Sequence, residues 1–182
     1  SYTATVTTGV KAIDGAALVS PYSWTFATAA CPCSLFSPVL LPASVSLSTA
    51  DGRTGTGPFT YEMGVKVTVD QAMTLNALHF YKSPGETGTH IGRIWTSGGI
   101  LLGQVTFSGE TTSGWQSQAL TSSITLQPGA TYVVSVNENS FFVMTRSGLA
   151  TQIVSGPLRS VADGANGVFA NAAGTFPNQS FS

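Results

Sequence analysis

Charged side chains are scarce in this sequence. Asp, Glu, Lys and Arg make up 8% of its 182 residues, against roughly a quarter in a typical globular protein. The seven Lys and Arg residues are scattered, so no basic run could neutralise a row of phosphates, and we predict no nucleic-acid partner. No apolar stretch approaches the roughly 18 to 20 residues that cross a bilayer, so we also predict no membrane span.

Residues and motifs typical of catalysis are also scarce. His79 and His90 are the only histidines, and neither a Gly-x-Ser-x-Gly elbow nor a Cys–His arrangement in a recognisable context occurs. The eight acidic residues show no spacing typical of a metal loop or of a glycosidase pair. We therefore predict that the protein is not an enzyme and that it holds no cofactor.

The two cysteines, Cys31 and Cys33, are separated by a single residue. Without a second cysteine pair they do not predict a structural zinc site. An exported chain favours oxidation, yet a disulfide between residues i and i+2 closes a small, strained ring. A disulfide between Cys31 and Cys33, free thiols and crosslinks between chains all stay open.

Apolar residues are plentiful, at 42%, so the polar surface must come from Ser, Thr, Asn, Gln and Gly. This hydroxyl-rich, charge-poor composition suits extracellular β-proteins, because β-branched Thr fits a pleated strand and stays soluble without Lys or Glu. We therefore expect a secreted protein, in the extracellular space or at the cell surface.

Short stretches of alternating apolar and polar residues predict strands along most of the chain, separated by Gly, Pro, Asp or Asn. Their spacing of about 8 to 12 residues, without a convincing helix, predicts an all-β, antiparallel β-sandwich of jelly-roll or Ig-like type, with little or no helix. Residues 31–60 are expected to be a long loop, and the tail from residue 148 mostly loop around one or two strands. The expected strands are residues 2–8, 24–26, 63–69, 75–81, 92–96, 101–107, 115–120, 124–126, 132–136 and 141–145.

The strand at residues 132–136 shows the alternation most clearly. Tyr132 and Val134 share one face, which we expect to pack, and Val133 and Ser135 share the other. We expect that second face to be partly wet.

Several segments stand in an order that resembles a known family. They are Cys31 to Phe36, Glu62 to Val67, His79 to Lys82, Gly88 to Trp95, Gly109 to Thr111, Gly114 to Gln116 and Thr131 to Ser135. Together they resemble the domain of unknown function 4082 family of bacterial secreted proteins, over about residues 30–182. The resemblance implies a β-sandwich and no established activity. The aromatic strand that usually ends the family is not found before Ser182, so we expect the last strand to be missing.

A second resemblance covers Tyr2 to Thr28. It rests on Asp14-Gly15 and on Trp24 to Phe26. This segment is similar to the final strands of a surface-layer-type bacterial Ig-like domain. We therefore predict two parts, with residues 1–29 as the C-terminal strands of an Ig-like domain and residues 30–182 as the β-sandwich module.

Four side chains on successive predicted strands are candidates for a ligand site. His79 and Tyr81 share one strand face, Arg93 and Trp95 share another, and a hairpin between the strands would bring all four together. Such a group could stack on a sugar ring and hydrogen-bond its hydroxyls, although Tyr81 and Trp95 also suit a core. Trp115, at the start of a strand, is a further candidate.

Carboxylates that are distant in sequence can meet in space. Asp51, Glu62 and Asp163 are therefore the candidate ligands for a structural calcium ion that bridges long loops.

These patterns support two functions. The first is a non-catalytic binding or adhesion module of a multidomain bacterial protein, with carbohydrate as the ligand. The alternative is a structural subunit of an extracellular fibre or surface layer, assembled by strand exchange, because unpaired strand edges recruit other strands. The expected partners are a glycan, other domains of the parent protein, or copies of the chain itself.

Overall fold

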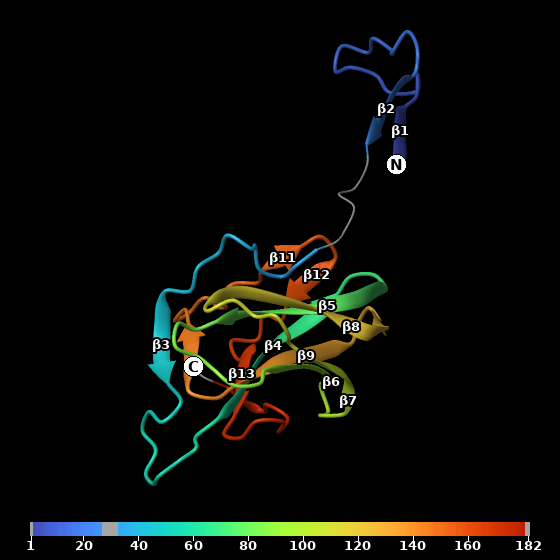
Figure 1. The fold of residues 1–182 in the computed structure, drawn as a ribbon. Helices are drawn as coiled ribbons and strands as arrows, with labels where there is room; N and C mark the ends of the chain where they lie inside the picture. The colour runs from blue at the N-terminus through green and yellow to red at the C-terminus, as the bar shows by residue number, and fades with distance from the viewer. Residues whose placement is uncertain (1, 27–32, 181–182) are drawn as a thin grey trace. The chain divides into compact units, whose positions relative to one another are not determined.

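The smaller of two units in the chain is a two-stranded sheet. The computed structural model describes residues 2–26 and 33–180, and it divides the chain into Ser1–Cys33 and Ser34–Ser182. In the first unit, β1 (Tyr2–Val6) pairs antiparallel with β2 (Tyr22–Phe26) (Figure 1). The turn between them uses the predicted Asp14-Gly15 pair, where Gly15 has a φ of 84° that side chains disfavour.

The larger unit is built on an antiparallel eight-stranded sheet (Figure 1). Along its main path the strand order is β11-β12-β4-β9-β6-β7, and β13 pairs with both β4 and β14. The strands are β4 (Tyr61–Val69), β6 (Ile91–Thr96), β7 (Leu101–Thr106), β9 (Thr131–Glu138), β11 (Val154–Ser155), β12 (Leu158–Ser160), β13 (Gly167–Ala170) and β14 (Gln179–Ser180).

Two smaller antiparallel sheets complete this unit. β5 (Met73–Lys82) pairs with β8 (Gly114–Leu126), and β3 (Ser44–Ser48) pairs with β10 (Phe141–Met144). The β5–β8 pair matters most for the candidate sites, because its two faces carry different kinds of side chain.

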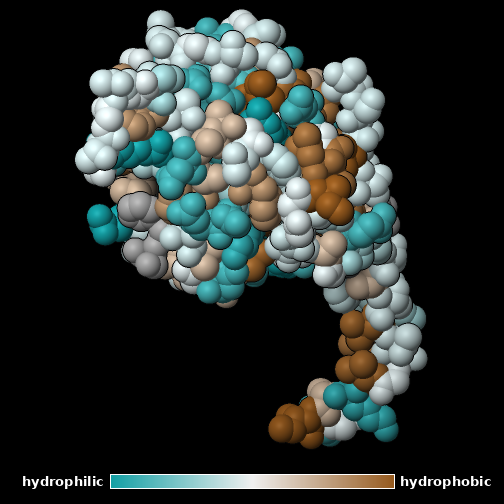
Figure 2. Space-filling view, turned by 90° about the horizontal axis from the view of Figure 1, so that it is seen from below, coloured by the Kyte–Doolittle hydropathy of each residue, from teal (hydrophilic) through white to brown (hydrophobic). Residues whose placement is uncertain are grey.

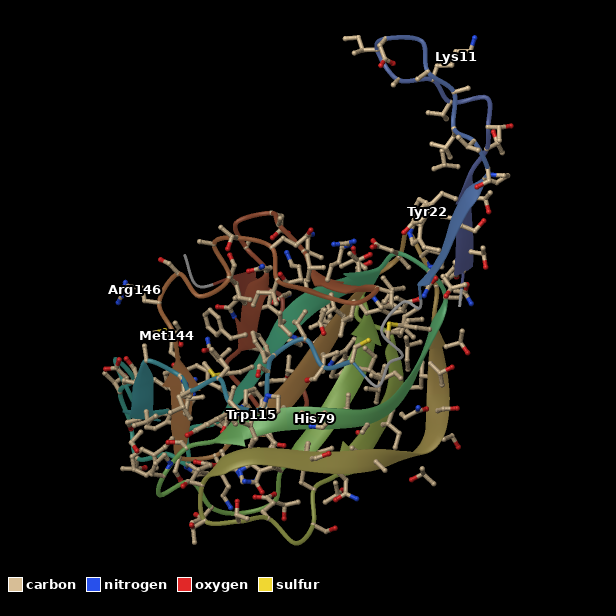
Figure 3. All side chains as sticks on the ribbon, turned by 90° about the horizontal axis from the view of Figure 1, so that it is seen from above. Lys11, Tyr22, His79, Trp115, Met144 and Arg146 are labelled. Atoms are coloured by element: carbon tan, nitrogen blue, oxygen red, sulfur yellow. The ribbon has the colours of Figure 1, made fainter. Side chains whose placement is uncertain are left out.

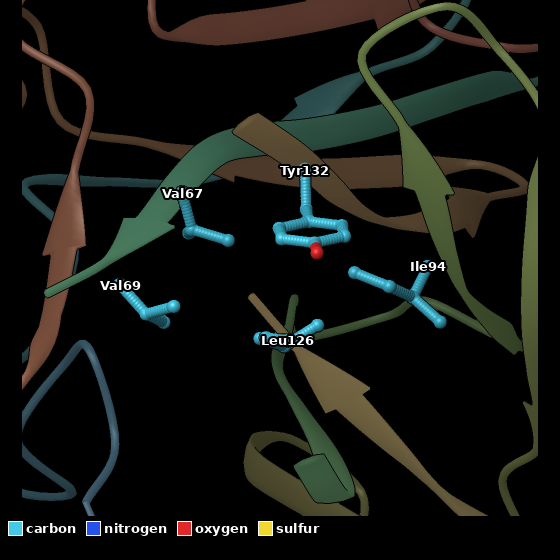
Figure 4. Close-up of a cluster of buried hydrophobic side chains, with 5 residues drawn as sticks. All are labelled: Val67, Val69, Ile94, Leu126 and Tyr132. Carbon is cyan, nitrogen blue, oxygen red and sulfur yellow. The ribbon is translucent and has the colours of Figure 1, made fainter. Parts of the chain in front are cut away.

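The core lies between the large sheet and the β5–β8 pair. Val67, Val69, Ile94 and Tyr132 from the large sheet meet Leu126 from β8, and each of these side chains is at most 7% exposed (Figure 4). Burial of one such side chain contributes roughly 1.5 to 3 kcal/mol. Side chains of facing sheets that meet in this way make an all-β antiparallel sandwich, which confirms the predicted fold class.

The described residues contain no helix, and therefore none long and apolar enough to cross a membrane. On the face seen in Figure 2, pale residues of intermediate hydropathy predominate over strongly hydrophobic ones. This agrees with a surface supplied by Ser, Thr and Gly.

Several elements differ from the sequence expectation. The expected loop at residues 31–60 contains β3, residues 114–126 form one long strand where two were expected, and the tail carries four short strands. The second face of β9 is not wet, because Val133 packs with Trp95, Val168 and Phe176. Cys31 lies outside the described residues, so a disulfide with Cys33 stays a prediction.

Candidate functional site

The outer face of the β5–β8 pair carries three of the predicted ligand-binding residues. Leu78 and Phe80 point into the core, so the alternation of a strand turns His79 and Tyr81 to the opposite face. The register places Tyr81 opposite Trp115 and His79 opposite Ser117. Figure 3 shows His79 and Trp115 close together on these two strands.

Aromatic rings gather at this face. The rings of Tyr81 and Trp115 meet edge to face with centroids 5.6 Å apart, and Phe36 stacks against Trp115 at 6.2 Å. The indole Nε1 of Trp115 donates a hydrogen bond to the Leu40 carbonyl oxygen at 2.8 Å, which fixes the ring. We call Phe36, His79, Tyr81 and Trp115 the outer aromatic cluster.

The outer aromatic cluster is half-buried and uncharged. His79 is exposed, while Phe36, Tyr81 and Trp115 are half-buried. Partial burial by its neighbours lowers the pKa of His79, so its ring is neutral at neutral pH. The face therefore combines apolar ring surface with a neutral imidazole that can both donate and accept hydrogen bonds.

Arg93 and Trp95 do not join this cluster. The hairpin expected between the strands of His79 and Arg93 does not form, because β5 pairs with β8 while β6 lies in the large sheet. Trp95 is 6% exposed and its Nε1 donates to the Ser135 hydroxyl oxygen at 2.8 Å. Both side chains are thus core residues of the large sheet rather than part of an accessible platform.

Glu62 is the buried partner of Arg93. Its Oε2 accepts hydrogen bonds from Arg93 Nη1 and from the Gly174 backbone N–H, both at 2.8 Å, and its Oε1 accepts one from the Ser135 hydroxyl at 2.6 Å. Glu62 itself is 0% exposed. Each carboxylate oxygen is already bonded, so this ion pair is a closed structural element.

The three carboxylates expected to hold calcium do not meet. Glu62 is bonded to Arg93, Asp163 forms an ion pair with Lys66 at 2.8 Å, and Asp51 is exposed. In the described part of the chain, the residues that come close enough to share a metal ion are Glu86, His90 and Glu138.

Glu86 and His90 form a buried pair in the segment between β5 and β6. His90 Nε2 lies 3.0 Å from Glu86 Oε1, and its Nδ1 lies 2.9 Å from both oxygens of Glu110. Lys82 Nζ lies 2.8 Å from Glu110 Oε2. Burial alone would lower the pKa of His90, but the hydrogen bonds to Glu86 and Glu110 outweigh it and raise this pKa.

Glu86 also holds the turn between β9 and β10. Its Oε1 accepts the Asn139 backbone N–H at 2.8 Å, and its Oε2 accepts those of Ser140 and Phe141 at 2.8 and 2.5 Å. Burial alone would raise the pKa of Glu86, but the hydrogen bond from His90 and those from the three backbone groups lower it.

Glu138, at the end of β9, is the one member of this group with an unsatisfied atom. It is 4% exposed, and its Oε2 has no hydrogen-bond partner. Burial raises the pKa of Glu138 well above its usual range, and the negative charges of Glu86, Glu110 and Glu62 raise it further. A buried, unpaired carboxyl is costly, so this position calls for a physical explanation.

Sequence reasoning missed Glu86, Glu138 and Phe36. Glu86 and His90 are four residues apart on a loop, and outside a helix this is no established spacing of metal ligands. Glu138 lies 48 residues after His90 in the sequence. Only the pairing of β6 with β9 brings the two segments together.

A family model described as "Domain of unknown function (DUF4082)" matches residues 48–182. No curated protein and no solved structure matches the chain.

Proposed function

The chain belongs to the DUF4082 family, and we propose that it is a non-catalytic binding module of a secreted or cell-surface protein, with carbohydrate as its ligand. The outer aromatic cluster would be the contact surface. The observation that supports this proposal is the pairing of Tyr81 with Trp115 beside an exposed, neutral His79 on one sheet face.

The chemistry of this face suits a sugar. A sugar ring has apolar C–H faces and neutral hydroxyl edges, so aromatic side chains can cover the former while a hydrogen-bonding group takes the latter. His79 is placed to exchange hydrogen bonds with a hydroxyl without carrying a charge that would need a counter-ion. Trp115 contributes ring surface only, because its Nε1 already donates to Leu40.

The burial of several acidic and histidine side chains in the larger unit favours binding over catalysis. Glu62, Glu86 and His90 are at most 1% exposed, so a substrate could not touch them in this conformation. A general acid or base must lie within hydrogen-bonding reach of the reacting group. We therefore assign to these residues a role in stabilising the folded module.

The proposal is tested with a glycan array, followed by titration calorimetry of the intact chain with the oligosaccharide that gives the strongest signal. We expect Tyr81→Ala and His79→Ala each to weaken binding by about tenfold or more, which corresponds to roughly 1.4 kcal/mol. Trp24→Ala removes an exposed aromatic side chain from the other unit and is the matched control.

Two results would contradict the glycan proposal. The first is the absence of any glycan signal from the folded protein, and the second is a signal that Tyr81→Ala leaves unchanged. Because Trp115 also packs against Phe36, the milder Trp115→Phe replacement is the variant to use at that position.

We propose assembly as the second function, on an independent observation in the first unit. The sheet of β1 and β2 has two strands of five residues, and its Tyr22 and Trp24 are 65% and 44% exposed. A two-stranded sheet is only marginally stable in water, and added strands or an apolar partner stabilise it. This supports a structural subunit in which β1 and β2 are completed by a neighbouring copy.

Light scattering on the purified full chain tests assembly. We expect particles larger than a monomer, with a mass that falls when residues 2–28 are deleted or when Trp24 is replaced by Ser. A monomer at concentrations of about 100 μM, or a polymer unaffected by the deletion, would refute this second function.

A further inference from the structure

We propose that Glu86, His90 and Glu138 form a binding site for a divalent transition-metal ion, with Zn²⁺ as the test ion. One ligand atom from each residue lies within 4.8 Å of the others, and all three side chains are buried. This site is separate from the outer aromatic cluster, so it holds or fails independently of the proposed glycan binding.

The independent sign of a ligand is the orphaned oxygen of Glu138. The side chain is 4% exposed and its Oε2 has no partner, although Glu86 and His90 lie beside it. Buried polar atoms in folded proteins nearly always have a partner, so an atom without one marks a place for a missing group. A metal ion among the three residues would satisfy this oxygen.

His90 is held as metal-binding histidines are held. Its Nδ1 lies 2.9 Å from the Glu110 carboxylate, which is itself fixed by Lys82 Nζ at 2.8 Å. A carboxylate that accepts the Nδ1 proton directs the Nε2 lone pair toward the ion and fixes the ring orientation. Nε2 is the atom that faces Glu86.

The spacing of the His90 and Glu86 ligand atoms agrees with a small ion, and Glu138, within 4.8 Å of both, would move inward to reach it. Two ligands about 2 Å from a tetrahedral ion lie about 3.3 Å apart. His90 Nε2 and Glu86 Oε1 are 3.0 Å apart, so a shift of a few tenths of an ångström admits the ion in place of the proton between them.

The charges of the surrounding groups agree with a divalent ion. A metal ion requires a neutral His90 and ionised carboxylates, so the protons on these groups leave as the ion binds. In that state the carboxylates of Glu86, Glu110 and Glu138 outnumber the ammonium of Lys82 by two negative charges. Such an excess is unfavourable in a medium of low dielectric constant. A divalent cation cancels it.

An imidazole nitrogen with two carboxylates favours a transition metal over calcium. Calcium takes six to eight oxygen ligands, whereas Zn²⁺ accepts nitrogen and oxygen ligands in sets of three or four. The ion would join the loop between β5 and β6 to the end of β9, because Glu86 and Glu138 come from those two segments. Its role would therefore be to hold this end of the sandwich together.

The test is a Zn²⁺ titration of the full chain after removal of metals with EDTA, followed by calorimetry and native mass spectrometry. We expect one Zn²⁺ per chain, a higher midpoint of thermal unfolding with Zn²⁺, and no comparable shift with Ca²⁺. Glu138→Gln should weaken Zn²⁺ binding at least tenfold. Because it removes an unpaired buried carboxyl, it should fold without metal as well as the parent chain does.

Two controls separate this site from adventitious binding. His79→Gln removes the exposed histidine and Asp51→Asn removes an exposed carboxylate, and both should keep full Zn²⁺ affinity. Co²⁺ bound to the unmodified chain should show visible absorption typical of nitrogen and oxygen ligands, a measurement that does not depend on any variant folding.

Three results would each overturn the proposal. They are the absence of a one-to-one complex, equal Zn²⁺ affinity of Glu138→Gln and the parent chain, and loss of Zn²⁺ binding in His79→Gln. In those cases the Glu86–His90 pair is a metal-free ion pair.

Discussion

Replacing Glu62 by Ala should destabilise the larger unit more than most single substitutions in it. The variant leaves Arg93 charged, 8% exposed and without its carboxylate. It also removes the acceptor for the Ser135 hydroxyl and the Gly174 N–H. Removing one partner of a buried ion pair costs about 3 to 5 kcal/mol, because an uncompensated charge stays inside the protein.

The free energy of unfolding is measured by urea titration. The signal is tryptophan fluorescence, since Trp95 donates to the same Ser135. For a unit of this size each kcal/mol shifts the thermal midpoint by roughly 2 to 4 °C, so Glu62→Ala should lower it by about 6 to 20 °C.

The double variant Glu62→Met with Arg93→Met separates the charge effect from the loss of packing. Both charges are then gone, and hydrophobic replacement of a buried pair is often neutral or stabilising, so most of the lost stability should return. A loss below about 1 kcal/mol in Glu62→Ala, or a double variant less stable than the single one, would refute the assignment of this pair as the buried structural element of the large sheet.

Two further predictions concern residues of β4, an inner strand of the large sheet. The hydrogen bond from Lys66 lowers the pKa of Asp163, so the pair stabilises the fold above the unfolded pKa near 3.8, and this stabilisation disappears as the pH falls through the lower folded value. In urea titrations the difference between the parent chain and Asp163→Asn should stay below about 1 kcal/mol at pH 6, since the pair is exposed, and vanish toward pH 2; a difference that grows in acid would contradict this. A Cβ at Gly64 would lie 2.7 Å from the Val134 backbone oxygen, so Gly64→Ala should cost about 1 to 3 kcal/mol by overpacking. Gly98→Ala, whose nearest neighbour would be 3.9 Å away, is the control and should change stability by less than about 0.5 kcal/mol, and equal effects of the two replacements would disprove the reasoning.

The alternation of side chains predicted most strands of the sandwich but not their partners. Leu78 and Phe80 point inward and His79 and Tyr81 outward, as a period of two requires. The same alternation was compatible with a hairpin between β5 and β6, and this pairing was wrong. The sequence between these strands has hairpin-like turn residues, yet the chain there crosses from one sheet to the other.

The candidate sites were predictable only in part. Tyr81, Trp115 and His79 could be chosen from the sequence because each is a side chain able to contact a ligand on a strand. Glu86 and Glu138 could not, because no spacing joins them and a lone carboxylate on a loop or at the end of a strand is usually solvated. Glu86 is enclosed because the backbone N–H groups of Asn139, Ser140 and Phe141, from a distant part of the sequence, bond to its carboxylate.

The sequence by itself determined the all-β class, the positions of most long strands and the inward or outward direction of their side chains, since each of these follows from local alternation and turn residues. The longest strand, β8, was the exception, because it was expected as two. The tertiary structure decided which strands pair, which outward faces are covered and which charges meet. Ser135 illustrates the difference: alternation placed it opposite the packed face of β9, and the packing of Trp95 and Val168 on that side made it buried. Such pairings join residues dozens of positions apart. The fold that is selected is the one in which all segments together bury the most apolar area and pair their buried charges.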